Sequence, residues 1–191
     1  MIGILLAAGF SRRFGASNKL LQPIADGRPI ALASAQNLIQ AMPTSIAVVR
    51  PENTILATML QQAGLTVFTC KEGEQEMAAS LAAAISLSAN FDAANHGFVI
   101  ALADMPYIQP ATIRLVANSL NDSQSIVIPT YHGQRGHPVA FAALYRSELE
   151  TLQGDEGARS IVKRHANAVH LLPCEDAGIV TDIDTPEDLK R

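Results

Sequence analysis

Apolar residues occur along this chain in short runs that alternate with longer amphipathic stretches. The short runs, several of them apolar at every position, predict strands at residues 3–7, 45–50, 66–69, 98–103 and 125–129. The amphipathic stretches predict helices at residues 29–41, 52–62, 75–87 and 110–120. Continuous apolar strands joined by helices are typical of a mostly parallel sheet with both faces covered. We therefore expect an α/β fold with helices on both faces of one sheet.

The pattern changes after residue 129. Two glycines, at 133 and 136, and the following Pro138 predict a hairpin or loop at the sheet edge. Two helices are expected near residues 142–153 and 157–165, and two strands near residues 169–172 and 179–183. A last helix is expected to begin at Pro186, with Thr185 as its N-cap. One α/β domain over residues 1–191 accounts for all of these elements.

Composition narrows the function classes. The net charge of −4 gives no electrostatic reason to expect binding to nucleic acid or to an anionic membrane. No stretch reaches the roughly 18 apolar residues of a membrane span, and the start lacks the basic region of a signal peptide. Cys70 and Cys174 have neither metal-site nor disulfide spacing, which indicates reduced thiols. We expect a cytoplasmic protein.

The first predicted strand runs into a loop of small and basic residues. Ala7, Ala8 and Gly9 leave space for a ligand near the backbone, and Arg12, Arg13 and Lys19 follow. Successive loop N–H groups with nearby cations suit a polyphosphate at the carboxyl end of a strand. The spacing matches neither the dinucleotide-binding glycine fingerprint nor the P-loop. A surface loop with solvated basic side chains is the alternative.

Two acidic residues follow predicted strands. Asp104 ends a buried strand, where a carboxylate needs a partner such as Mg²⁺, although it could instead cap the turn before Pro106. Alternation along an extended segment places Asp182 and Asp184 on one face. The following helix could bring Asp184 back to the site, or Asp184 could cap that helix; Asp182 is the weaker candidate.

Several of these segments resemble one family. The loop Leu-Ala-Ala-Gly-x-Ser-x-Arg-x-Gly followed by Lys19 resembles the signature of MobA-like nucleoside-triphosphate transferases, above all the molybdenum cofactor cytidylyltransferases. Ala-Asp-Met-Pro at 103–106 and Asp-Thr-Pro at 184–186 resemble the acidic motifs of the same family. The resemblance implies a three-layer Rossmann-like nucleotidyltransferase fold, with a mostly parallel mixed sheet.

The resemblance also implies roles for individual residues. Nucleotide binding would involve Leu6, Ala7, Ala8, Gly9, Ser11, Arg12, Arg13, Lys19 and Ser80. Mg²⁺ would be held by Asp104 and Asp184, and catalysis would rest on Arg13, Lys19 and Asp104. The acceptor would lie near the Gly-His-Pro segment formed by Gly136, His137 and Pro138, where His137 could donate a hydrogen bond to a phosphate or be partly protonated.

The reaction implied is transfer of CMP from CTP to a phosphorylated acceptor, with release of pyrophosphate. The expected acceptor is a pterin, molybdopterin or molybdenum cofactor, and a molybdoenzyme is a candidate partner. Glu76, Ala78 and Ala79 depart from the usual base-binding segment. The segment Gly154-Asp155-Glu156-Gly157-Ala158-Arg159 resembles a family motif, Gly-Asp-x-Gly-Ala-Arg, that a turn and a helix start would also explain. Three alternatives remain open: another phosphorylated acceptor, an oxidoreductase on the same fold, and a non-catalytic nucleotide-binding protein.

Overall fold

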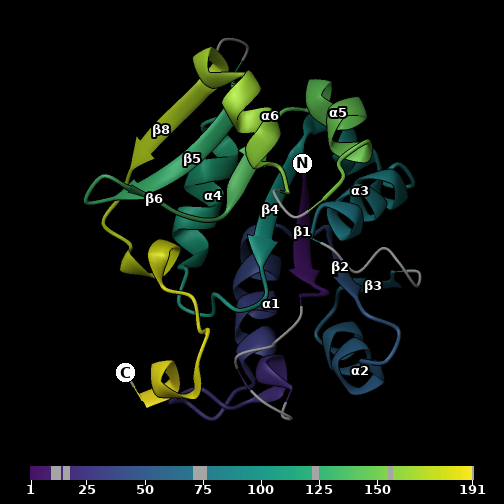
Figure 1. The fold of residues 1–191 in the computed structure, drawn as a ribbon, viewed down its shortest axis with the longest axis vertical. Coiled ribbons are helices and arrows are strands. Elements are labelled where there is room, and N and C mark those ends of the chain that lie inside the picture. Colours follow the sequence, from purple (N-terminus) through teal and green to yellow (C-terminus); the bar gives the residue numbers. More distant parts are fainter. Residues whose placement is uncertain (10–13, 15–17, 71–76, 122–124, 155–156, 191) are drawn as a thin grey trace.

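A central sheet carries helices on both of its faces (Figure 1). The computed structural model describes residues 1–9, 14, 18–70, 77–121, 125–154 and 157–190. Within these residues eight strands form one sheet, in the order β3-β2-β1-β4-β7-β5-β6, with β8 paired to β5. Their bounds are β1 Ile2–Ala7, β2 Ser45–Val49, β3 Thr66–Thr69, β4 Phe98–Leu102, β5 Ile126–Tyr131, β6 Gln134–Arg135, β7 Val139–Phe141 and β8 Val169–Pro173.

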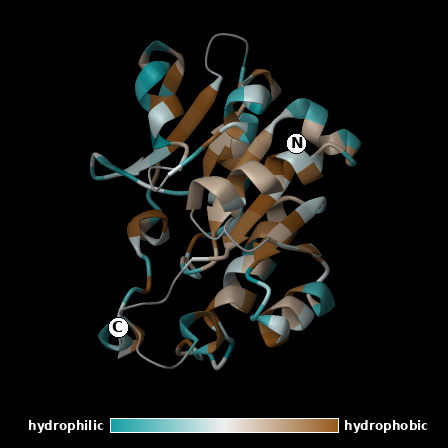
Figure 2. Cartoon of the chain, turned by 45° about the vertical axis from the view of Figure 1, so that its right-hand side comes forward, coloured by the Kyte–Doolittle hydropathy of each residue, from teal (hydrophilic) through white to brown (hydrophobic). Residues whose placement is uncertain are grey.

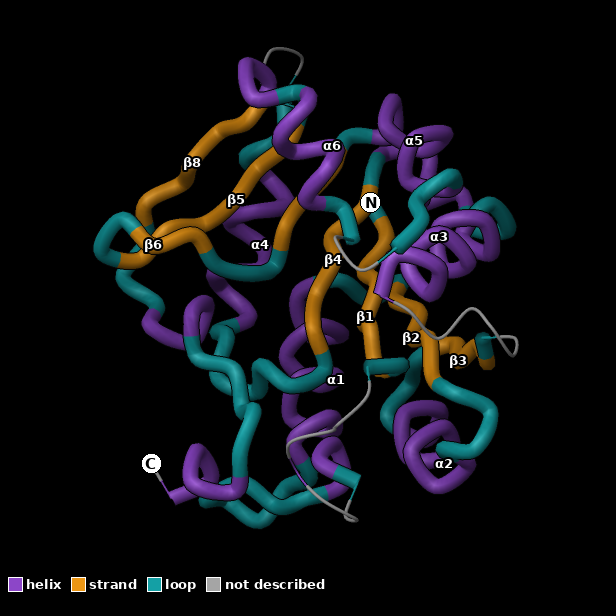
Figure 3. Tube along the Cα trace, viewed as in Figure 1, coloured by secondary structure: helices purple, strands orange, loops and turns teal. Residues whose placement is uncertain are grey.

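The sheet is mixed, because β6 and β7 are antiparallel to the strands beside them. β1 pairs in parallel with β2 and β4, β2 with β3, and β5 with β8. β7 is antiparallel to both β4 and β5, and β6 closes the predicted hairpin with β5. The predicted mostly parallel mixed sheet is confirmed. β1, β2 and β4 lie side by side (Figure 3), and because they are parallel, their carboxyl ends lie along one edge.

Alternate residues of each strand face opposite helical layers. Leu5 and Ala7 belong to a core with α1 (Ile30–Ala41), α2 (Thr54–Gln62) and α4 (Pro110–Asn118). Ile2 and Ile4 belong to a second core with α3 (Met77–Ser88), α5 (Arg146–Glu150) and α6 (Arg159–Arg164). Figure 2 shows the hydrophobic strands enclosed between these layers. The two-sided burial explains why the central strands are apolar at nearly every position.

One predicted strand is wrong. The segment expected as a strand at 179–183 instead contains a 3-10 helix, η6, at Ala177–Val180. The Asp176 carboxylate caps it by accepting a hydrogen bond from the Gly178 N–H at 3.0 Å, and this turn competes with an extended backbone. The last helix does begin at Pro186, but it is the 3-10 helix η7, Pro186–Lys190.

The segment from η6 to Ile183 joins two parts of the molecule. The Ile179 carbonyl accepts a hydrogen bond from the His137 N–H, and the Ile183 N–H donates to the Asp104 carbonyl, both at 2.9 Å. Gly136 is required for this contact, because an added Cβ would lie 2.3 Å from the Ile179 oxygen. In the described part of the chain, no helix has the length and hydrophobicity of a membrane span.

Candidate functional site

The Lys19 cluster (Lys19, Asp104 and Asp184) joins three distant parts of the sequence at the carboxyl edge of the sheet. The Lys19 ammonium lies 2.9 Å from Oδ2 of Asp104 and 3.2 Å from Oδ1 of Asp184. The Lys19 side chain is 9% exposed, whereas those of Asp104 and Asp184 are 25% and 42% exposed. A buried cation therefore lies between two carboxylates that remain accessible to a ligand.

Asn18 positions the lysine. It caps the short 3-10 helix η2, Lys19–Leu21, where its Oδ1 accepts a hydrogen bond from the Leu20 N–H at 3.1 Å. Its Nδ2 donates to Oδ1 of Asn53 at 3.1 Å. Asn18 was not predicted as a site residue, because a single Asn before a Lys carries no motif of its own. An N-cap preference for Asn is the signal that could have found it.

Asp104 follows directly from β4 through Ala103. The Ala103 N–H donates to the Leu6 carbonyl at 3.0 Å, which continues the β1–β4 pairing up to the acid. Among the described non-glycine residues, only His132 has a positive φ. Ala103 therefore leads into Asp104 without backbone strain.

Asp188 orders the chain around Asp184. Its Oδ2 accepts hydrogen bonds from the Asp184 N–H at 3.1 Å, the Thr185 N–H at 2.8 Å and the Thr185 hydroxyl at 2.9 Å. Asp182 is exposed, so the structure brings Asp184 into the cluster and leaves its neighbour outside.

The electrostatics of the cluster keep the lysine charged. Burial alone would lower the pKa of Lys19, but charge interactions and hydrogen bonds with Asp104 and Asp184 outweigh burial and raise that pKa. The described residues contain no group of three or more His, Cys, Asp or Glu side chains placed to hold a metal ion. Two carboxylates fit a hard divalent cation that takes its other ligands from water and phosphate oxygens.

The first loop is described only in part. Leu6 is half-buried, Ala7 and Ala8 are buried, and Gly9 is exposed with open space where a Cβ would lie. Ser11, Arg12 and Arg13 lie outside the described residues, so their predicted contacts with a nucleotide stay predictions. Phe14 is buried in the core that faces α1.

Ser80 lies inside α3. It is 2% exposed, and its hydroxyl donates to the Met77 carbonyl at 3.1 Å. The hydroxyl is thus engaged with its own helix, and the predicted contact with a nucleotide stays a prediction. Glu76, the departure from the family's base segment, lies outside the described residues.

A cavity of about 330 Å³ lies beside the Lys19 cluster, between α3 and α6 over the sheet. Leu6 and Leu102, which pair in register across β1 and β4, form part of its floor. Leu102 is two residues before Asp104, so the cavity reaches the end of β4 that leads to this carboxylate. Gly136 and His137 of the predicted acceptor segment line it, and Pro138 is buried next to them.

His137 is neutral at physiological pH. Burial, partly opposed by the negative charge of Asp104 and reinforced by the positive charge of Arg159, lowers the pKa of this imidazole to about 4. Its Nδ1 is buried and has no hydrogen-bond partner among the described residues. Of the two roles expected for His137, the structure favours hydrogen bonding over a positive charge.

Sequence comparisons relate this site to known proteins. A family model for the MobA-like NTP transferase domain matches residues 3–169. Purine catabolism protein PucB of Bacillus subtilis is 30% identical over 198 residues, covering 98% of this chain and 93% of PucB. Nicotine blue oxidoreductase of Paenarthrobacter nicotinovorans is 26% identical, covering 99% of this chain and 94% of that protein.

Solved structures of related proteins are similar to this chain over its whole length. Rv0371c from Mycobacterium tuberculosis H37Rv has a TM-score of 0.81 and 29% identity, covering 100% of this chain and 95% of that chain. The complex of Rv0371c with manganese has a TM-score of 0.78 and 27% identity, covering 100% and 96%. The matched residues, 3–169, include Lys19 and Asp104. This chain therefore belongs to the MobA-like family of nucleotidyltransferases, as its sequence motifs predicted.

Proposed function

We propose that this protein transfers CMP from CTP to a phosphorylated acceptor, with molybdopterin as the favoured acceptor, and releases pyrophosphate. The observation that carries this proposal is the Lys19 cluster. It offers a charged lysine and two accessible carboxylates at the edge of the sheet, beside a cavity of ligand size. A triphosphate needs a cation of this kind, and a second substrate needs a neighbouring pocket.

In the proposed reaction, a phosphate oxygen of the acceptor attacks the α-phosphorus of the nucleotide. The new O–P bond forms as the bond between the α-phosphorus and the pyrophosphate oxygen breaks, and pyrophosphate leaves with the electron pair. The attacking phosphate is already an anion, so no general base is required. Lys19 neutralises negative charge on the phosphate oxygens, and catalysis rests on positioning and electrostatic stabilisation.

Mg²⁺ is the proposed cofactor, and Asp104 and Asp184 would hold it. Two carboxylates suit this ion when phosphate oxygens and water complete its shell. When bound, it would supply charge stabilisation for the triphosphate. Support for a divalent ion comes from the complex of the related Rv0371c with manganese.

Asp188 is expected to act as a positioning residue for that ion. Changing Asp188→Ala removes the acceptor of three hydrogen bonds around Asp184, so we expect Mn²⁺ affinity in the presence of CTP to fall about tenfold. Spin-resonance titration with Mn²⁺ measures this affinity. Asp188→Asn, which keeps an acceptor oxygen, should recover part of it.

A merely structural role for Asp188 would lower the melting temperature and leave Mn²⁺ affinity of the folded protein unchanged. Glu187→Gln is the matched control, because Glu187 is the exposed acid next to it. Equal Mn²⁺ affinity in the Asp188→Ala and Glu187→Gln variants would refute the positioning role.

The direct test of the function is pyrophosphate release from CTP, GTP, UTP and ATP, each with Mg²⁺ and molybdopterin. We expect release with CTP to exceed release with the others. Release with a different nucleotide would correct the donor, and release only with another phosphorylated acceptor would correct the acceptor. No release under any of these conditions would overturn the transferase proposal.

A molybdoenzyme partner for the product remains part of the same proposal. The name of the related nicotine blue oxidoreductase makes hydride transfer a useful parallel assay. Oxidation of a nicotinamide cofactor without pyrophosphate release would favour the oxidoreductase alternative. CTP binding without either reaction would favour a non-catalytic protein.

A further inference from the structure

The cavity beside the Lys19 cluster has an apolar floor. It is lined by side chains of the sheet face, such as Ile100 and Phe141, and by Leu81 of α3 and Val162 of α6. A cavity of about 330 Å³ is at the small end of the range for organic ligands. The floor therefore fits an apolar or aromatic group of one or two rings.

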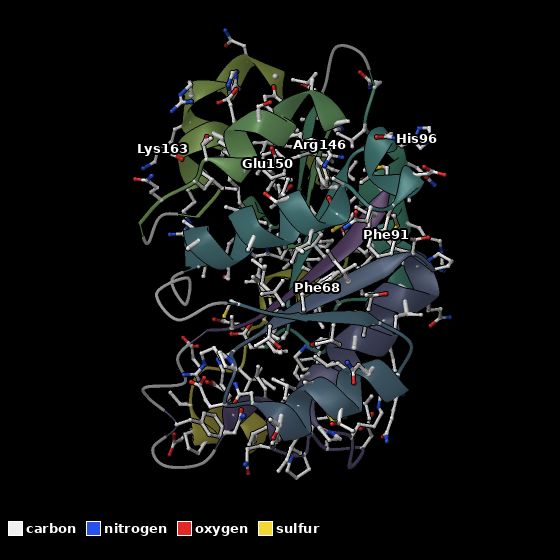
Figure 4. The ribbon with its side chains drawn as sticks, turned by 90° about the vertical axis from the view of Figure 1, so that its right-hand side faces the viewer. Phe68, Phe91, His96, Arg146, Glu150 and Lys163 are labelled. Atoms are coloured by element: carbon white, nitrogen blue, oxygen red, sulfur yellow. The ribbon has the colours of Figure 1, made fainter. Side chains whose placement is uncertain are left out.

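Basic side chains stand around this apolar floor. This basic rim consists of Arg135 on β6 and of Arg159 and Lys163 on α6. Arg159 and Lys163 are four residues apart, so they lie on the same side of α6. Figure 4 shows Lys163 at one side of the helical layer, away from Arg146 and Glu150 of α5.

Other arginines of this layer are already engaged by the protein. Arg146 donates to the carbonyls of Ile85 and Ala94, and Arg164 pairs with Glu148 at 2.7 Å. By contrast, the structure gives Arg135 and Arg159 no acidic partner within the described part of the chain. Two guanidinium groups at the mouth of an apolar cavity are suited to an anion, which they can bind in a bidentate manner.

His137 connects the basic rim to the Lys19 cluster. Its imidazole lines the cavity, and the charges of both Asp104 and Arg159 act on its pKa. An anion held by Arg159 would therefore lie near His137. The neutral imidazole can add a hydrogen bond to such a ligand, whereas the positive charge comes from the rim.

We propose that Arg135, Arg159 and Lys163 bind the phosphate of the acceptor, and that its aromatic or apolar ring system fills the cavity lined by Leu81, Val162 and Phe141. This inference rests on the proposed function and deepens it, because it assigns recognition of the acceptor to residues outside the Gly-His-Pro segment. It also gives the Gly-Ala-Arg motif a chemical role that a helix start alone would not require. The acceptor class is thus a phosphate monoester that carries an aromatic or heteroaromatic ring system.

The test is equilibrium binding of 2-naphthyl phosphate to the whole protein without nucleotide, measured by calorimetry. We expect this probe to bind at least tenfold more tightly than either 2-naphthol or inorganic phosphate. Arg159→Gln and Lys163→Gln should each weaken its binding about tenfold, because each removes a charge-assisted contact. Arg164→Gln is the matched control, since the Arg164 guanidinium pairs with Glu148. This variant should bind 2-naphthyl phosphate as tightly as the unchanged protein.

Val162→Trp tests the apolar half of the cavity and should abolish binding of 2-naphthyl phosphate. If that variant does not fold, the two charge variants still decide the outcome. Equal binding of 2-naphthol, or unchanged binding in both Arg159→Gln and Lys163→Gln, would overturn the proposal. Naphthyl phosphate binding of the expected kind, with no pyrophosphate release from any nucleotide, would support this subsite and overturn the transferase function alone.

Discussion

Replacing Asp104 by asparagine is expected to lower kcat for pyrophosphate release by about a thousandfold, which corresponds to roughly 4 kcal/mol of transition-state stabilisation. The substitution is isosteric, but it removes a negative charge that contacts Lys19 and would bind the metal ion. The Asp104 backbone carbonyl still accepts from Ile183, so the C-terminal segment should stay in place. Steady-state kinetics with CTP and Mg²⁺ measure the loss.

Asp182→Asn is the control for this prediction. Asp182 is an exposed acid two residues before Asp184, and losing its charge should leave kcat within about twofold. Circular dichroism and the melting temperature establish that both variants are folded. A kcat for Asp104→Asn within a few-fold of the unchanged protein would rule out a metal-binding role for Asp104.

The strands were predictable because buried strands need apolar residues, and these form continuous apolar runs in the sequence. β1, β2, β4 and β5 lie between two helical layers, which requires apolar residues on both faces. The segment at 179–183 has similar hydrophobicity but no place in the sheet. Its conformation depends on tertiary contacts, since Gly178 packs against the Tyr107 carbonyl and Gly136 against that of Ile179. No local pattern encodes such contacts.

The individual residues of the site were predictable from motifs, but their arrangement in space was less predictable. Asp104 and Asp184 were identified as acids after predicted strands, and Lys19 as a cation after the first loop. In this contact, Asp104 and Asp184 are separated from Lys19 by 85 and 165 positions in the sequence. The contact also depends on hydrogen bonds of Asn18 and Asp188, which no motif marks. The basic rim likewise combines β6 and α6, which only the folded chain brings together.

The contact of Lys19 with both carboxylates has a consequence for metal binding. The ammonium occupies the space between Asp104 and Asp184, so a divalent ion that binds both acids must compete with a positive charge. A triphosphate removes this conflict, because its oxygens offer Lys19 another partner. Nucleotide and metal should therefore bind cooperatively, each raising the affinity of the other by the same factor.

The substitution Lys19→Met separates the effect of Lys19 on metal binding from its effect on turnover. Without the ammonium, the two carboxylates lose their counter-charge at about 3 Å, and we expect Mn²⁺ affinity of the nucleotide-free protein to rise about tenfold. Turnover with CTP should fall by about a hundredfold or more, because the triphosphate loses a charge-stabilising partner. Arg28→Gln, which removes an exposed cation paired with Asp26, should change neither quantity. Lower or unchanged Mn²⁺ affinity in Lys19→Met would show that the ion does not bind between Asp104 and Asp184, whatever the effect on turnover.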